Sequence, residues 1–176
     1  MIFRETPLAG VWLIDPEPLT DERGFFARTW CRDEFARRGL VADLAQCSVS
    51  WTRARATVRG LHYQARPHEE AKLVRCTRGA VHDVALDVRG GSPTFGRWVA
   101  AELTADNRRM LYVPEGVAHG FQTLAEDTEV FYQISASHHP QSERGVRWND
   151  PACAIAWPLS PVSVSPRDAA LPSLGE

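Results

Sequence analysis

The sequence predicts an all-β sandwich or barrel. Short runs rich in Val, Leu, Phe, Trp and Thr recur along the chain, and residues typical of turns separate them. Only the segment Arg32–Arg38, which contains Phe35 and is followed by Gly39 as a stop, has the pattern of a helix. Many short strands with almost no helix between them are typical of antiparallel sandwiches and barrels.

Turn residues set the boundaries of the expected strands. Clear turn signals occur at positions 21–24, 78–79, 90–93 and 114–116, where Gly, Pro, Asp and Ser gather. The part after Trp157 is rich in Pro and Ser, and we expect an irregular segment packed over the mouth or rim of the barrel. The expected strands are Gly10–Ile14, Gly24–Trp30, Leu44–Trp51, Thr57–Gln64, Lys72–Arg78, Ala80–Val88, Arg97–Leu103, Arg109–Val113, His119–Leu124 and Thr128–Ser135.

Length and composition indicate a single domain over residues 1–176. A chain of 176 residues that is 44% hydrophobic can bury a core, which excludes a disordered protein. The net charge of −2 lacks the basic surplus that a nucleic-acid partner needs. No apolar run approaches the ~20 residues of a membrane span, and the first residues lack an export signal. We therefore expect a cytoplasmic protein without membrane contact, with reduced thiols at Cys31, Cys47, Cys76 and Cys153.

The alternation of side chains along the strands predicts a lined pocket in place of a filled core. In Ala80–Val88, Asp83 shares a face with Val81, Ala85 and Asp87, while His82, Val84, Leu86 and Val88 share the other. His62 is expected to point inward from Thr57–Gln64, with Gly60 leaving room near it. Tyr132 projects from an apolar face of Thr128–Ser135. Small barrels with such polar groups inside can hold one ligand.

Three side chains are candidates for proton chemistry, and each also has a purely structural interpretation. His62 has the intrinsic acidity of a general base near neutral pH, but a strand histidine is often only a hydrogen-bonded core residue. Tyr132 is either a core phenol or a proton donor. Lys72 is the single lysine among 20 basic residues. It is either a solvated charge after Glu69 and Glu70 or a group that stabilises a substrate oxyanion.

Other motifs give weaker signals. Arg23 next to Phe25 and Phe26 suits a phosphate and a stacked ring, or simply the end of a β-hairpin. The spacing of the histidines, of which His138 and His139 are adjacent, matches no metal-ligand motif, and no CxxC occurs, so we expect no metal. Phosphate-binding glycine loops and a GxSxG nucleophile motif do not occur either.

Several blocks occur in an order that resembles the dTDP-4-dehydrorhamnose 3,5-epimerase family. The likeness runs from about Gly10 to Asp168. The blocks are Asp-Glu-Arg-Gly-Phe-Phe at 21–26, Leu-His-Tyr-Gln at 61–64, Lys-Leu-Val-Arg-Cys at 72–76, Ser-Pro-Thr-Phe-Gly at 92–96, Pro-Glu-Gly-Val-Ala-His-Gly-Phe at 114–121 and Arg-Trp-Asn-Asp-Pro at 147–151.

The resemblance implies a cupin-type jelly roll that works as a homodimer, without metal or organic cofactor. The implied substrate is a nucleotide-linked 4-keto-6-deoxyhexose, and the implied reaction inverts C3, C5 or both through an enolate. His62 would be the base, oriented by Asp168; Tyr132 would be the acid on the other face, and Lys72 would stabilise the enolate oxygen. Positions implied to bind the substrate are Arg23, Phe26, Gln46, Arg59, Asp83, His119, His138, Glu143 and Arg167.

The sequence departs from the family pattern at positions of substrate recognition. Cys47 and Ser48 stand where the family has Asp and Asn, and one extra residue lies between Gln46 and Arg59. Arg28 replaces a Glu, and His138 replaces an aromatic residue. These changes leave a non-catalytic sugar-binding cupin as an alternative. Two further alternatives are a 3,4-ketoisomerase of the same fold and a metal-dependent oxygenase.

Overall fold

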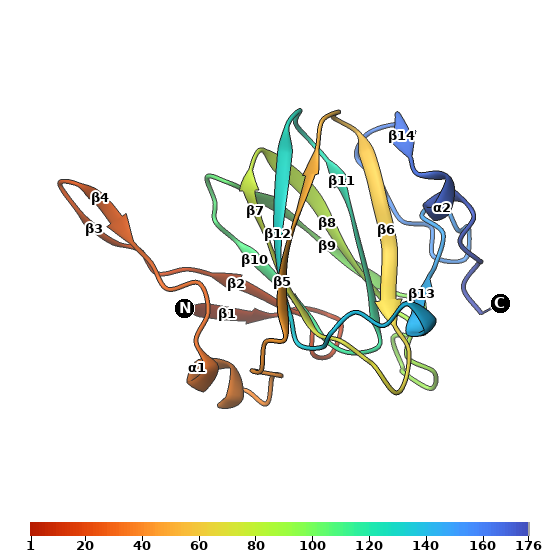
Figure 1. Cartoon of the computed structure of the whole chain (residues 1–176), viewed down its shortest axis with the longest axis horizontal. Coiled ribbons are helices and arrows are strands. Elements are labelled where there is room, and N and C mark those ends of the chain that lie inside the picture. The colour runs from red at the N-terminus through yellow and green to blue at the C-terminus, as the bar shows by residue number, and fades with distance from the viewer. Residues whose placement is uncertain (176) are drawn as a thin grey trace.

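The computed structural model describes residues 1–175 as two β-sheets packed face to face, with a hairpin arm that projects from one end (Figure 1). The arm consists of β3 (Leu19–Asp21) and β4 (Gly24–Phe26). The first sheet has the order β1 (Ile2–Glu5), β2 (Trp12–Asp15), β10 (Met110–Val113), β7 (Lys72–Arg78), β12 (Thr128–Ile134) and β5 (Gln46–Thr52). The second has the order β13 (Glu143–Gly145), β6 (Thr57–Gln64), β11 (Val117–Thr123), β8 (Ala80–Asp87) and β9 (Trp98–Thr104), with β14 (Ser163–Val164) beside β6.

Helices are short and peripheral. They are α1 (Arg32–Ala36), a single 3-10 turn (Pro140–Ser142) and α2 (Pro166–Ala169). None of the helices within residues 1–175 is long and apolar enough to cross a bilayer. The all-β prediction is therefore confirmed.

Apolar residues from both sheets fill the space between them. Val74 of β7 lies in one buried cluster with Val81 and Ala85 of β8. Val84 and Leu86 contact a different cluster on the outer face of the same strand, so the expected alternation along β8 is confirmed. Each buried valine or leucine among them contributes about 1.5–3 kcal/mol when its side chain leaves water.

Two expected elements end two or more residues earlier in the structure than in the prediction. The strand expected over Gly24–Trp30 ends at Phe26, because its partner β3 has only three residues. The helix expected over Arg32–Arg38 ends at Ala36, and the N–H of Gly39 donates to the carbonyl of Ala36 in the turn that follows. Gly39 has a φ of +69°, a backbone conformation that favours glycine at helix ends.

The structure also contains strands that the sequence did not reveal: β1, β3, β13 and β14. The prediction of an irregular tail was partly wrong, because the segment after Trp157 includes β14 and α2. Each of these elements has two to four residues and is held by its neighbours; β14, for example, pairs in parallel with β6. Local sequence patterns carry little information about strands this short.

The space expected beside Gly60 is taken by backbone. A side chain on Gly60 would meet the Cα of Gly120 at 2.6 Å and the carbonyl oxygen of His119 at 2.7 Å. Gly60 therefore allows β6 and β11 to approach closely, and it does not leave room beside His62 as predicted. The approach brings His62 opposite His119 in the pairing of the two strands.

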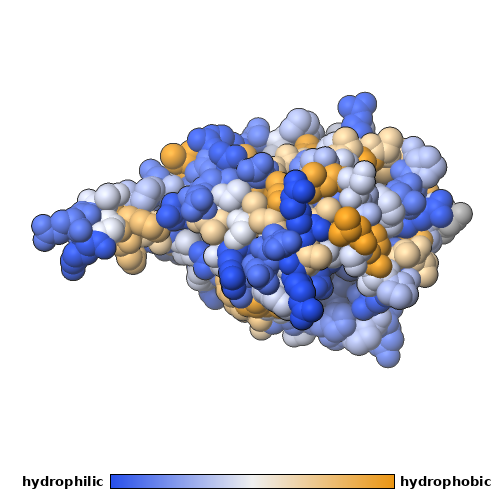
Figure 2. All heavy atoms as spheres, turned by 90° about the horizontal axis from the view of Figure 1, so that it is seen from above, coloured by the Kyte–Doolittle hydropathy of each residue, from blue (hydrophilic) through white to orange (hydrophobic). Residues whose placement is uncertain are grey.

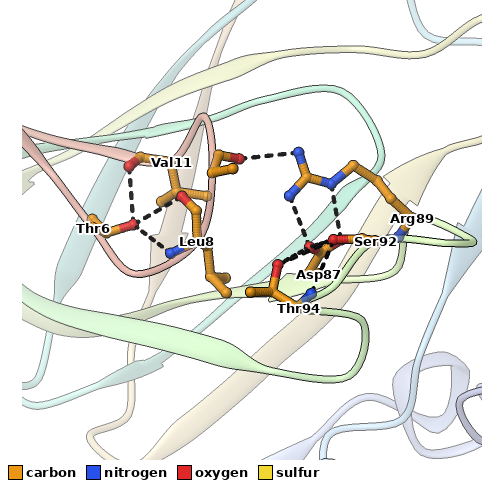
Figure 3. A network of polar contacts seen from close by, with 8 residues as sticks. Thr6, Leu8, Val11, Asp87, Arg89, Ser92 and Thr94 are labelled. Atoms are coloured by element: carbon orange, nitrogen blue, oxygen red, sulfur yellow. Dashed lines mark hydrogen bonds and ion pairs between the residues drawn. The ribbon is translucent and has the colours of Figure 1, made fainter.

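A polar network fixes the connection between β8 and β9 (Figure 3). The buried carboxylate of Asp87 accepts hydrogen bonds from Arg89 at 2.8 and 2.9 Å, and from Ser92 and Thr94 at 2.6 Å each. Arg89 also donates to the carbonyl of Ala9 at 3.0 Å, which ties this loop to the N-terminal turn. Burial alone would raise the pKa of Asp87, but the hydrogen bonds from Arg89, Ser92 and Thr94 hold it well below its usual range.

Candidate active site

Two adjoining cavities lie between the sheets. The first, of about 230 Å³, is lined by side chains of β5, β7 and β12 from one sheet and of β6, β11 and β13 from the other. The second, of about 470 Å³, lies toward β14 and α2. Arg59, His62 and Tyr132 line both cavities. The predicted polar groups of β6 and β12 thus face a common space.

His62 is held by a carboxylate from the C-terminal segment. Its Nε2 lies 2.8 Å from Oδ1 of Asp168, and the second carboxylate oxygen accepts the N–H of Gly60 at 3.1 Å. The hydroxyl of Ser165 caps α2 by accepting the N–H of Asp168 at 3.0 Å, which fixes the carboxylate in place. Burial would raise the pKa of Asp168, but the hydrogen bonds from His62 and Gly60 lower it overall. Asp168 is therefore an anion that orients the imidazole through Nε2 and leaves Nδ1 free for a proton.

Tyr132 faces the same space from the opposite sheet. Its ring lies edge-on to the imidazole of His119, with the ring centroids 5.9 Å apart. Burial raises the pKa of Tyr132, and the negative charge of Asp83 raises it further. The phenol is therefore protonated at neutral pH and can act as a donor.

Lys72 begins β7 in the wall of the first cavity. Its Nζ lies 2.9 Å from Oε1 of Glu70 and donates to the carbonyl of His62 at 3.2 Å. The side chains of Lys72 and Glu70 are about 90% buried, with exposed fractions of 10% and 9%. The interpretation of Lys72 as a solvated charge is therefore wrong. Glu70 belongs to the site, and the only signal in the sequence was its place two residues before the single lysine.

A second histidine–carboxylate pair lies beneath the cavity wall. His119 Nε2 is 2.8 Å from Oδ1 of Asp83, and both side chains are buried, with exposed fractions of 5% and 0%. His119 lines the first cavity, whereas Asp83 does not. The structure therefore places Asp83 behind His119, where it orients the imidazole, and not in contact with a ligand in the cavity.

Most of the predicted binding residues meet at the cavities. Gln46, Arg59, His138 and Glu143 line the first cavity, and Arg167 lines the second together with Arg59. Glu143 forms an ion pair with Arg167 and lies 3.9 Å from Nε2 of His138. Burial would raise the pKa of Glu143, but the charge and hydrogen bonding of Arg167 lower it overall.

Arg23 and Phe26 do not join this group. Both lie on the projecting arm, where the side chain of Arg23 is 84% exposed and Phe26 is 69% exposed. Arg23 pairs with Asp21 of its own hairpin. Figure 2 shows hydrophilic atoms at the tip of this arm and apolar atoms between the tip and the body. Within residues 1–175 of one chain, the arm stands away from β6 and β12 (Figure 1), and no residue of β3 or β4 lines either cavity.

The positions that depart from the family pattern fall in two places. Ser48 and His138 lie in the cavity wall. Cys47 is exposed on the other face of β5, and Arg28 forms an ion pair with Glu34 near the base of the arm. The chain therefore differs from the pattern inside the cavity at Ser48 and His138, where a ligand would be contacted.

Several residues of the cavities were missed. Ser50 shares a face of β5 with Gln46 and with Ser48, which the family pattern had already indicated, so alternation along that strand could have found Ser50. Ser163 and Ser165 had no such signal, because the tail was expected to be irregular. The further members of the two walls are Tyr63, Gln64, Glu70, Gly120, Phe121, Ile134, Thr57 and Val58.

The chemical character of the two cavities differs. The first combines a base, a buried cation and a phenol, which suits proton transfer beside a carbonyl group. The second combines Arg59 and Arg167 with serine hydroxyls, which suits an anionic group such as a diphosphate. In the part of the chain that the structure describes, no three His, Cys, Asp or Glu side chains come together as metal ligands.

The sequence matches a family model described as dTDP-4-dehydrorhamnose 3,5-epimerase over residues 5–176. Two curated relatives carry that same name. The protein of Sinorhizobium fredii is 45% identical over 181 residues, covering 100% of this chain and 91% of the relative. The protein of Salmonella typhimurium is 41% identical over 178 residues, covering 100% of this chain and 97% of the relative.

Solved structures of sugar epimerases superpose closely. NovW, a 4-keto-6-deoxy sugar epimerase from the novobiocin cluster of Streptomyces spheroides, gives a TM-score of 0.94 at 40% identity, covering 99% of this chain and 87% of NovW. The Legionella pneumophila enzyme in complex with dTDP-4-keto-L-rhamnose gives a TM-score of 0.92 at 37% identity, covering 98% of this chain and 92% of that enzyme. ChmJ, a 3'-monoepimerase from Streptomyces bikiniensis in complex with dTDP-quinovose, gives a TM-score of 0.88 at 34% identity, covering 97% of this chain and 87% of ChmJ. The predicted cupin-type jelly roll is confirmed by these likenesses.

Proposed function

This chain belongs to the dTDP-4-dehydrorhamnose 3,5-epimerase family, and we propose that the cavity between its sheets is where a nucleotide-linked sugar is epimerised. The chain is an epimerase of deoxysugar biosynthesis that acts at C3, C5 or both of a dTDP-4-keto-6-deoxyhexose. The reaction is an isomerisation, since a proton leaves one face of a carbon and another proton enters from the opposite face. The observation that carries the assignment of the site is that His62 and Tyr132 face one cavity from opposite sheets.

His62 removes the first proton. The 4-keto group acidifies the C–H bonds on the neighbouring carbons, and Nδ1 of His62 takes the proton while the bonding electrons move into the enolate. The imidazolium that forms is stabilised by Asp168, whose carboxylate lies 2.8 Å from Nε2. Gly60 and Ser165 hold that carboxylate in place, so the geometry is ready before the substrate arrives.

Two further groups complete the reaction: one stabilises the enolate oxygen, and the other supplies the second proton. The buried ammonium of Lys72 stabilises the negative charge on the oxygen, and a dry wall makes this charge more effective than it would be in water. Tyr132 delivers a proton to the opposite face of the carbon, and its raised pKa supports the role of a neutral donor. Proton loss on one side and gain on the other inverts the centre.

Arg59 and Arg167 hold the diphosphate in the second cavity, and the serines there complete the hydrogen bonding. The sugar then lies between His62 and Tyr132, which line both cavities. His138 and Ser48 contact the sugar or the nucleotide from the wall of the first cavity.

The working form is a homodimer in the cytoplasm. The arm exposes Leu19, Phe25 and Phe26 to water at 72%, 48% and 69%, which a second copy of the chain would cover. The predicted substrate contacts of Arg23 and Phe26 also require a cavity other than that of their own chain. All four cysteines are unpaired in the structure, which supports a reducing compartment.

The test is the incubation of dTDP-4-keto-6-deoxyglucose with the protein in D₂O, followed by NMR. Deuterium at both C3 and C5 indicates a double epimerase, and deuterium at one of them a mono-epimerase. A His62→Asn variant is the control for spontaneous exchange. No incorporation, together with tight binding of the sugar nucleotide, would favour the non-catalytic binding protein. A 3-keto product with the proton moved to C4 would favour the ketoisomerase.

A further inference from the structure

The segment before β7 has a fixed backbone. The N–H of Ala71 donates to the hydroxyl of Ser135 at 2.8 Å, and the carbonyl of Ala71 accepts the N–H of Ser135 at 3.0 Å. The side chain of Ala71 is buried in the cluster on the outer face of the first sheet. In an extended chain, Glu70 and Lys72 therefore point to the opposite side, and both line the first cavity.

Glu70 and Lys72 form an ion pair that is nearly removed from water. The Nζ–Oε1 distance is 2.9 Å, and only about a tenth of each side chain is exposed. Glu69, the adjacent residue of the same type, instead pairs with Arg66, whose side chain is 89% exposed, and lies outside both cavities. The environment of Glu70 is therefore specific to its position.

We propose that Glu70 is a positioning residue that holds the Lys72 ammonium in the geometry needed to stabilise the enolate; this inference rests on the proposed function. Lysine has a flexible four-carbon stem and three N–H donors. One donor is used by the carbonyl of His62, and the carboxylate of Glu70 occupies a second direction. One donor is left for a substrate oxygen. A cation buried without a partner is costly, so Glu70 also makes it favourable for the charge to stay in this wall.

The hydrogen bond from Lys72 to the carbonyl of His62 links the position of the ammonium to that of the base. Lys72 donates to the backbone carbonyl of the residue whose imidazole takes the proton. Glu70 therefore fixes the distance between the oxyanion-stabilising group and the base, and its loss moves the cation while both catalytic side chains remain present. The expected signature is a fall in kcat with little change in KM.

The test uses the fact that Lys72 is the only lysine of the chain. Protein made with lysine labelled with ¹³C at Cε gives a single side-chain signal, and its relaxation reports the mobility of Lys72 without any substrate. Three variants are compared with the wild type: Glu70→Ala, Glu70→Gln and, as the matched control, Glu69→Gln. Turnover of the 4-keto sugar nucleotide is measured for each.

In the wild type and in Glu69→Gln we expect a rigid Lys72 and full turnover. In Glu70→Ala we expect a mobile Lys72 and a kcat lowered roughly 10- to 100-fold, somewhat less than when an oxyanion donor is removed outright. Glu70→Gln keeps an acceptor oxygen, so we expect it to restore part of the rigidity of Lys72 and part of kcat. This variant provides the test if Glu70→Ala does not fold. A rigid Lys72 and unchanged kcat in both Glu70 variants would overturn the inference. A wild type that does not turn over the sugar contradicts the proposed function, whereas the mobility of Lys72 still decides the role of Glu70.

Discussion

At the scale of the residue, the pair of His62 and Asp168 determines how the rate depends on pH. We expect kcat/KM to fall on the acid side with a single ionisation, because a protonated imidazole cannot accept a proton from carbon. Asp168 has a lowered pKa and stays ionised over this range, so it adds no second step. The measurement is the rate of deuterium incorporation between about pH 5 and 8, with circular dichroism at each pH. A rate that does not change with pH contradicts the role of His62.

A variant at Tyr132 can distinguish removal of the proton from its return to the opposite face of the carbon. Replacing it with Phe removes the donor but keeps the ring that packs near His119. We expect epimerised product to fall by roughly 10²–10⁴-fold, while exchange catalysed by His62 on its own face persists in part. Chiral analysis of the product together with the deuterium content gives both rates. Tyr112→Phe is the matched control, since that buried phenol accepts the N–H of Val41 on the outer side of the sheet. Full activity in Tyr132→Phe removes the residue from the mechanism.

Single residues could be predicted when their type is unusual for their place. Lys72 is unusual because it is the only lysine, and His62 and Tyr132 because they interrupt apolar strand faces. The resemblance supplied Asp168, which lies 106 residues from its partner. Glu70 could not be predicted, because a glutamate beside another glutamate resembles a solvated pair. Its burial depends on tertiary packing that the local sequence does not reveal.

At the scale of the element, the network around Asp87 connects the β8–β9 loop to the N-terminal turn. The pKa of Asp87 is lowered in the folded protein, so this carboxylate stabilises the fold above the pKa of an unfolded aspartate, and that stability disappears as the pH falls. We expect Asp87→Asn to lower the free energy of unfolding by about 2 to 4 kcal/mol at pH 7. Urea unfolding at pH 7 and at about pH 3 measures the difference in unfolding free energy between wild type and variant. This difference should shrink at the lower pH, because the wild type loses part of the stability that ionised Asp87 contributes.

Asp106→Asn is the control for this experiment, since that residue is exposed and lies outside the network. If Asp87→Asn were as stable as the wild type at pH 7, the network would contribute no net stability. Retained turnover in Asp87→Asn is expected at temperatures where it is folded, because the network does not line either cavity.

The same scale shows where prediction from sequence fails. The strands Thr57–Gln64 and Lys72–Arg78 were predicted with their observed bounds, and both contain apolar and β-branched residues and end next to polar or turn residues. β3 and β14 have only three and two residues, and β14 depends on pairing with β6, which lies about a hundred residues earlier in the chain. Ser163 and Ser165 reach the second cavity only because such a pairing forms.

At the scale of the whole molecule, the arm predicts a shared active site. Each copy carries a cavity with His62 and an arm with Arg23 and Phe26 that does not reach it. We expect light scattering to give twice the mass of the chain. We also expect that a His62→Asn chain and an Arg23→Ala/Phe26→Ala chain, each weakly active alone, regain about a quarter of wild-type activity when mixed after dissociation, because half of the dimers are mixed and each has one complete site.

A mixture that stays as inactive as its components would show that the arm does not complete the cavity of a partner chain. An Asp106→Asn chain mixed with the His62→Asn chain serves as the matched control, because its arm and its cavity are both intact. The oligomeric state could not be derived from strand patterns, since the three apolar side chains of the arm resemble ordinary core residues in the sequence.

The separation of His62 and Asp168 along the chain also has a consequence in time. A ribosome adds roughly 5–20 residues per second. The strand with the base is therefore made about 5 to 20 seconds before the carboxylate that orients it, which follows 106 residues later. Loop-closure entropy opposes the meeting of the two until the jelly roll between them has formed. The pair of base and orienting carboxylate is therefore incomplete in a growing chain until translation has passed α2.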